Sequence, residues 1–162
     1  MTQSTASSSS DLPRAGLLRR LAALLYDTFL VAAIWMLVGF AVELIAGTDS
    51  NQLVDGKVQT DPLVDNILFI LMLASSSGFY LWFWTKSGQT LGMIAWRIKL
   101  IDQHGQLIKL QQGIVRFLAA WPAFFLFGIG YFWIYIDAQG DALHDKFSKT
   151  RVVVVPKSHR PF

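Results

Sequence analysis

The sequence predicts an all-α transmembrane helical bundle with two clear spans, a third broken or re-entrant hydrophobic segment and a small cytoplasmic β-hairpin cap. Three observations lead to this fold class. Of the 162 residues, 53% are hydrophobic and 15% are charged, whereas about 25% of the residues of a soluble domain are charged. The apolar residues form three long blocks, and the basic residues flank those blocks. Much of the chain is therefore expected to be surrounded by lipid.

The two ends of the chain differ in composition from its middle. Residues 1–13 are rich in Ser and Thr, and such a segment buries too little apolar surface to offset the entropy of ordering. We expect a disordered tail over residues 1–13, a membrane domain over residues 14–156 and a short carboxyl-terminal tail over residues 157–162.

The first apolar block runs from about Leu17 to Ala46 and begins around Arg19 and Arg20. Its apolar run of roughly 25 residues is longer than the core of a secretory signal peptide and long enough to cross a bilayer. We therefore expect a spanning helix that is retained and that ends at Gly47. The polar stretch 48–65 is rich in Asp and is expected to form an external loop.

The second apolar block runs from about Leu63 to Thr85, and Pro62 can open its helix. It contains a run of small residues, 75–78. Small residues let helix backbones approach closely in lipid, so a packing face is favoured over a binding role for this run.

A β-hairpin is predicted between the second and third blocks. Residues 96–101 and 106–110 alternate between apolar and polar side chains, and the turn residues 102–105 separate them. The β-branched stretch 150–155 can add a third strand. Together these segments would form a small cap on the membrane domain.

The third apolar block, residues 114–136, is long enough to span a membrane but is interrupted by Pro122, Gly128 and Gly130. It either crosses the membrane or dips into it and returns. Cytoplasmic segments carry an excess of Lys and Arg, which places the amino terminus in the cytoplasm. The re-entrant arrangement keeps thirteen of the fourteen basic residues on that side, so it is the favoured prediction.

Asp27 is the most informative charged residue, because a carboxylate within a spanning helix costs about 2.5–3.5 kcal/mol at the bilayer centre. It follows Arg20 by seven residues, so the two residues share a helix face while standing roughly 10 Å apart along the axis. They can line one pocket without forming a direct ion pair. Asp27 is either a proton or cation site or a structural polar contact between helices.

His144 and Asp145 follow the third block and suggest a proton relay or a metal site. Adjacent residues point in different directions, however, and the sequence contains no ligand set with metal-binding spacing. A salt bridge from Asp145 to a basic residue is therefore favoured over a metal site.

Several classes of protein have no support in the sequence. There is no Cys, so neither a disulfide framework nor a thiolate site is possible. Motifs for a catalytic nucleophile or for phosphate binding are absent, so we expect neither an enzyme nor a bound cofactor or metal. The pI is near 9.3, but the basic residues flank the apolar blocks as they do at an anionic membrane surface. We therefore expect no nucleic acid partner.

Three separated motifs occur in order along the chain. They are residues 20–27 (Arg-Leu-Ala-Ala-Leu-Leu-Tyr-Asp), residues 88–92 (Gly-Gln-Thr-Leu-Gly) with 96–102, and residues 143–146 (Leu-His-Asp-Lys) with 150–153. Together they resemble the RDD family, which is named for one arginine and two aspartates. The resemblance implies a multi-spanning membrane protein, with transport proposed for the family, and it makes Arg20, Asp27 and Asp145 the three named residues. After residue 92 many relatives carry basic residues, where this chain has Met93 and Ile94.

Two functions follow from these observations. If Arg20, Asp27 and Asp145 meet near the inner face, they form a site with a net charge near minus one, which suits a proton or a monovalent cation. His144 and Arg97 are secondary candidates. The first hypothesis is ion transport by a homo-oligomer in a bacterial-type inner (plasma) membrane. The alternative is a non-catalytic accessory or assembly protein in which the Arg/Asp/Asp set is structural.

Overall fold

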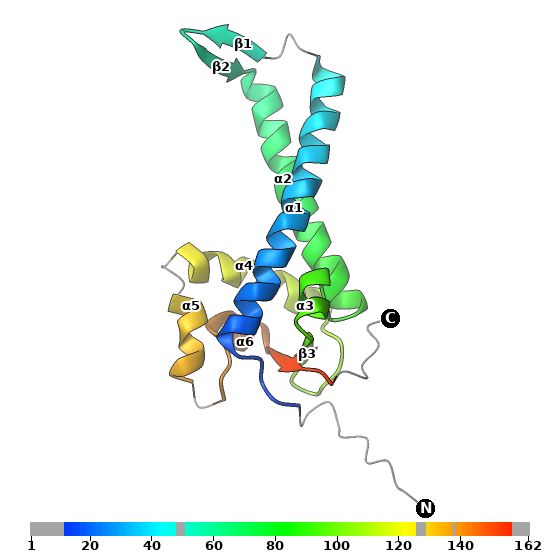
Figure 1. Ribbon diagram of the computed structural model, residues 1–162, viewed down its shortest axis with the longest axis vertical. Coiled ribbons are helices and arrows are strands. Elements are labelled where there is room, and N and C mark those ends of the chain that lie inside the picture. Colours follow the sequence, from blue (N-terminus) through cyan, green and yellow to red (C-terminus); the bar gives the residue numbers. More distant parts are fainter. Residues whose placement is uncertain (1–11, 48–50, 126–128, 138, 157–162) are drawn as a thin grey trace, which may run out of the picture. The chain divides into compact units, whose positions relative to one another are not determined.

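The computed structural model describes residues 12–47, 51–125, 129–137 and 139–156, which form mostly helices (Figure 1). The chain divides into two compact units, which are described separately. Unit 1 comprises Met1–Asp27 and Tyr80–Phe162, and unit 2 comprises Thr28–Phe79. The predicted tails, residues 1–13 and 157–162, lie outside the described residues except for Leu12 and Pro13.

Two helices are long and apolar enough to cross a membrane. Helix α1 (Leu17–Ala46) has 30 residues and α2 (Pro62–Lys86) has 25 residues. At a rise of 1.5 Å per residue these lengths correspond to about 45 Å and about 38 Å, more than the roughly 30 Å of a bilayer core. The predicted bounds of both helices agree with the structure to within one residue. No third helix of this kind occurs among the described residues.

Within unit 2, the segment predicted as an external loop contains a β-hairpin. Strands β1 (Asn51–Val54) and β2 (Lys57–Thr60) pair antiparallel. Asp55 and Gly56 at the turn have φ values of 51° and 73°, and two such residues are what a two-residue type I′ turn requires. The Asp-Gly pair was therefore the signal that the sequence analysis missed.

One small residue of α2 takes part in helix packing. The indole Nε1 of Trp35 in α1 donates a hydrogen bond to Ser76 Oγ at 2.9 Å and to the carbonyl oxygen of Met72 at 3.1 Å. Ser76 is buried, as the packing interpretation of residues 75–78 predicts, whereas Gly78 is exposed and a Cβ there would meet nothing within 4 Å.

Unit 1 contains a two-stranded sheet, but its pairing differs from the prediction. Strand β3 (Ile98–Asp102) pairs antiparallel with β4 (Thr150–Val154), with Leu100 opposite Val152. The predicted hairpin is wrong because residues 106–110 form no strand. The physical reason is burial: β4 places Val152 and Val153 in the core, whereas Ile108 is the one buried residue of the segment 106–110.

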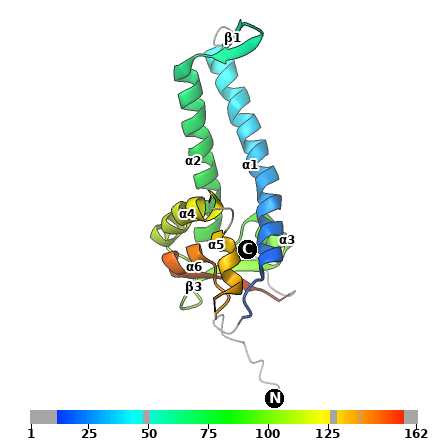
Figure 2. The same cartoon turned by 90° about the vertical axis from the view of Figure 1, so that its left-hand side faces the viewer.

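The third apolar block is broken, as predicted. Helix α4 (Leu110–Phe125) is followed by the one-turn helix α5 (Ile129–Phe132) and the 3₁₀ turn η3 (Trp133–Tyr135). Pro122 stays inside α4, and residues 126–128, which include Gly128, lie outside the described residues. Helix α6 (Leu143–Ser148) then packs against α4, and Figure 2 shows both with α5 and β3 in unit 1.

The first and last described segments lie side by side in unit 1. The amide of Val154 donates to the carbonyl oxygen of Pro13 at 2.8 Å, and the amide of Ala15 donates to that of Val152 at 2.9 Å. These bonds add the segment before α1 to the free edge of β4. The start of α1 and the strand that follows α6 are therefore held together.

Candidate functional site

A buried cluster of two arginines and one aspartate joins three helices of unit 1. Arg20 comes from the first turn of α1, Arg116 from the middle of α4 and Asp145 from α6. Asp145 Oδ2 accepts from Arg20 Nη1, and Asp145 Oδ1 accepts from Arg116 Nη1. Asp145 Oδ2 also accepts from the amide of Ala142 at 3.0 Å, which caps α6. Below, the arginine–aspartate cluster means Arg20, Arg116 and Asp145.

Further contacts fix both guanidinium groups in place. Arg20 Nε donates to the carbonyl oxygen of Ala15 at 2.9 Å. Arg116 Nη1 donates to Thr150 Oγ1 at 2.9 Å. The guanidinium carbon of Arg116 also lies 5.5 Å from the ring centroid of Trp84, which is within cation–π range.

The cluster is nearly inaccessible to water, and this determines its charge state. Asp145 is fully buried, and Arg20 and Arg116 are each 6% exposed. Burial alone would raise the pKa of Asp145, but the adjacent guanidinium groups of Arg116 and Arg20 outweigh burial and hold that pKa well below its usual range. Burial, reinforced by Arg116, lowers the pKa of His144 to about 3, so this imidazole is neutral at pH 7.

Asp27 is also buried, but its partners are neutral donors. Thr90 Oγ1 donates to Asp27 Oδ2 at 2.5 Å, and the amide of Gly92 donates to Asp27 Oδ1 at 2.9 Å. Thr90 is the residue that caps α3 (Leu91–Ala95), and its Oγ1 accepts from the amide of Met93 at 3.3 Å. The carboxylate of Asp27 thus ties α1 to the first turn of α3.

Three residues of the segment 88–92 each make a different close contact with a neighbouring element. Gly88 has φ +74°, and a Cβ there would lie 2.6 Å from the carbonyl oxygen of Leu100. Gln89 Nε2 donates to the carbonyl oxygen of Ile98 at 2.8 Å. A Cβ at Gly92 would lie 2.9 Å from Asp27 Oδ1. The segment therefore docks against both β3 and α1.

A small cavity of about 80 Å³ is lined by both arginines of the arginine–aspartate cluster and by Asp27. Tyr131 and His144 also line it, together with apolar side chains that include Met93 and Leu100. Two buried lining atoms, Arg20 Nη2 and His144 Nδ1, have no hydrogen-bond partner within the described part of the chain. The cavity thus holds polar groups within a mostly apolar lining.

Comparison with known protein families decides which family the chain represents. The family model described as the RDD family matches residues 14–149, which include the arginine–aspartate cluster and Asp27. The chain belongs to the RDD family. Together with its two long apolar helices, this membership indicates a membrane protein. The comparison with curated proteins found no match, and neither did the comparison with solved structures.

The structure brings together most of the residues that the sequence analysis selected in this RDD protein. Arg20 and Asp145 form a direct ion pair. Asp27 lines the same cavity as Arg20 without pairing with it, as the seven-residue spacing predicts. His144 also lines the cavity. Arg97 is exposed, has φ 52° and is not among the lining residues.

The sequence analysis missed Arg116 and Thr90 as members of the site. Arg116 changes the electrostatics, because it brings the formal charge of the four residues Arg20, Arg116, Asp27 and Asp145 to zero in place of the expected minus one. A signal was available, since Arg116 is the one charged residue between Lys109 and Asp137. No group of three or more His, Asp or Glu side chains that could hold a metal ion occurs among the described residues of this RDD protein.

Proposed function

We propose that this RDD-family membrane protein is a non-catalytic accessory or assembly protein, in which the arginine–aspartate cluster and Asp27 hold unit 1 in one geometry. The observation that carries this proposal is that protein donors hold both carboxylates. Each oxygen of Asp145 and of Asp27 accepts a hydrogen bond from a protein donor. The four residues Arg20, Arg116, Asp27 and Asp145 also carry no net formal charge, so the site has no excess negative charge to attract a cation.

The proposed location is a bacterial-type inner (plasma) membrane, with the chain crossing it more than once and its amino terminus in the cytoplasm. The concentration of Lys and Arg outside the 48–65 segment supports this orientation. The pairing of Pro13 and Ala15 with β4 supports a carboxyl-terminal segment on the same side. Unit 1 would then present its surface to a cytoplasmic partner protein or to a second copy of the chain. Neither a cofactor nor a nucleic acid is part of the proposal.

Replacing Asp145 with Asn tests this function. It leaves two buried guanidinium groups facing one carbonyl oxygen, so unit 1 should lose its geometry. In cells, the variant should show lower abundance or a disrupted complex with its partner, and no change in ion flux. Asp55→Asn is the matched control, because Asp55 is exposed and has a left-handed φ that Asn adopts readily. A stable Asp145→Asn variant in an intact complex would contradict the proposal.

Transport of a proton or a monovalent cation is the second candidate function. The cavity favours it, since Asp27 lines that cavity together with Arg20 Nη2, which lacks a partner among the described residues. Two spanning helices enclose no pathway alone, so this function requires a homo-oligomer. In proteoliposomes, the wild-type protein should then dissipate an imposed ion gradient and Asp27→Asn should not, while Asp55→Asn should behave as wild type. Equal flux through both variants would reject transport through Asp27.

A further inference from the structure

Helix α4 has its apolar and polar faces reversed relative to a helix of a soluble protein. Most of its exposed residues are large and apolar and recur at helical spacing, with Gln111 and Pro122 the other exposed positions among those described, whereas its one charged side chain, Arg116, points inward to Asp145. A surface helix in water shows the opposite arrangement. The large apolar exposed residues are Leu110, Ile114, Val115, Leu118 and Trp121, and they are called the outer face of α4 below.

The inner side of α4 fixes this orientation. Gly113 lies so close to α2 that a Cβ there would be 2.9 Å from Leu81 Cδ2. The ring of Phe117 lies 6.3 Å from that of Tyr80, and Arg116 is bonded to both Asp145 and Thr150. Rotating α4 to hide its outer face would break these contacts and would expose a buried ion pair. The outer face therefore stays outward.

Length and placement separate α4 from the spanning helices. Its 16 residues correspond to about 24 Å, less than the roughly 30 Å of the bilayer core. Within unit 1, Figures 1 and 2 both draw α4 crosswise to the first turns of α1. A helix that lies across the start of a spanning helix runs along the membrane surface and not through it.

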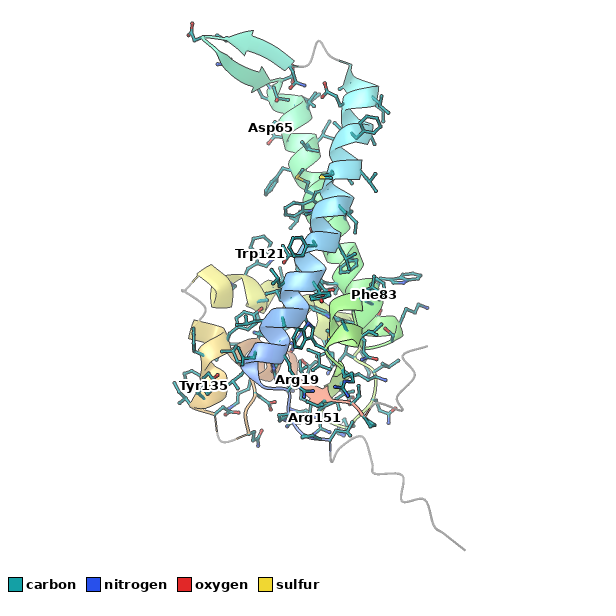
Figure 3. The ribbon with its side chains drawn as sticks, viewed as in Figure 1. Arg19, Asp65, Phe83, Trp121, Tyr135 and Arg151 are labelled. Carbon is teal, nitrogen blue, oxygen red and sulfur yellow. The ribbon has the colours of Figure 1, made fainter. Side chains whose placement is uncertain are left out.

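We propose that α4 lies in the membrane interface and that its outer face inserts into lipid. Charge complementarity supports lipid as the occupant, because Lys109 is exposed immediately before α4 and can meet anionic headgroups. Aromatic residues of the following elements are also outward: Phe132 is 55% exposed and Tyr135 is 71% exposed. Figure 3 shows Trp121 and Tyr135, residue types that favour the headgroup level of a bilayer. The third apolar block then holds unit 1 against the membrane independently of the two spans.

The absence of Cys from the sequence makes a direct test possible with single-cysteine variants. Ile114→Cys and Leu118→Cys would carry a nitroxide label on the outer face. Leu37→Cys, on an exposed position of α1, is the reference for lipid, and His104→Cys, in an exposed turn, is the reference for water. The full-length protein would be reconstituted in vesicles of phosphatidylethanolamine and phosphatidylglycerol. Collision of each label with oxygen and with a water-soluble nickel chelate would be measured by power saturation.

For lipid insertion, the oxygen-to-nickel collision ratio at positions 114 and 118 should be severalfold above that of His104→Cys and below or equal to that of Leu37→Cys. A ratio equal to that of His104→Cys would show that the outer face is in water and would overturn the proposal. Low collision rates with both reagents, together with spin–spin broadening, would show that a second copy covers the face and would also overturn it. A water-like ratio at Leu37→Cys would show that this part of α1 is not in lipid, and it would also overturn the proposal.

Discussion

Asp145→Asn is expected to be among the most destabilising polar substitutions in the described part of the chain. The side chain keeps its shape but loses its charge, so one carbonyl oxygen remains where two oxygens now serve Arg20, Arg116 and the amide of Ala142. Removing one member of a buried ion pair costs about 3–5 kcal/mol, because the partner charge stays buried without compensation. With two arginines left in this state, we expect a loss of at least about 3 kcal/mol in the free energy of unfolding.

Thermal unfolding of the purified protein in detergent measures this loss. Trp84 lies 5.5 Å from the guanidinium carbon of Arg116, so tryptophan fluorescence includes a reporter beside the cluster. For a chain of this size, about 3 kcal/mol corresponds to a decrease in Tm of roughly 6–12 °C. Thr150→Val removes the hydrogen bond from Arg116 Nη1 to Thr150 Oγ1 and the one between the hydroxyls of Thr150 and Ser148, but it leaves the ion pairs of Asp145 in place and should cost less, about 1–3 kcal/mol. A loss below about 0.5 kcal/mol for Asp145→Asn, comparable with an ordinary surface substitution, would refute the structural role of the cluster.

Three further predictions concern other parts of unit 1. Gly92→Ala places a Cβ 2.2 Å from the carbonyl oxygen of Ala23 and 2.9 Å from Asp27 Oδ1, so it should destabilise the protein by at least about 1–3 kcal/mol, whereas Gly16→Ala, with nothing within 4 Å, should not. His144 is neutral when folded but binds a proton below its usual pKa of 6.5 when unfolded, so unfolding should cost about 1 kcal/mol less at pH 5.5 than at pH 6.5. His144→Phe should remove that pH dependence, while the lowered pKa of Asp145 acts only below this window. Reporters fused before Met1 and after Phe162 should be active on the same side of the membrane, and activity on opposite sides would contradict the pairing of the two end segments.

The sequence predicted the long helices well because their physical signal is strong and local. Long apolar runs bounded by Arg20 at one end and Gly47 at the other leave little freedom in where α1 begins and ends. Helical geometry also placed Arg20 and Asp27 on one face without a direct contact, and the structure agrees. The ion pair between Arg20 and Asp145 was expected only from the family resemblance, because nothing local relates two residues 125 positions apart.

The errors arose where partners distant in the sequence decide the structure. Residues 106–110 alternate like a strand, but β4 supplies a more buried set of side chains for β3 to pair with. Arg116 was not selected, although it lies within the third apolar block, residues 114–136. Only the packing of α4 on α6 shows that Arg116 points inward.

The two aspartates therefore differ in what they need from their environment, and Asp27→Asn shows the difference. Asp145 balances two charges, whereas Asp27 accepts from the hydroxyl of Thr90 and the amide of Gly92. An Asn at position 27 can keep its carbonyl oxygen on Gly92 and donate through its amide to Thr90 Oγ1, because a hydroxyl can rotate to accept. The cost should be about 1 kcal/mol, well below that of Asp145→Asn in the same melting experiment. A loss as large as that of Asp145→Asn would mean that the charge of Asp27, and not its hydrogen bonds, stabilises the contact between α1 and α3. Because the substitution preserves the fold under this account, any loss of ion flux in Asp27→Asn would report on transport and not on misfolding.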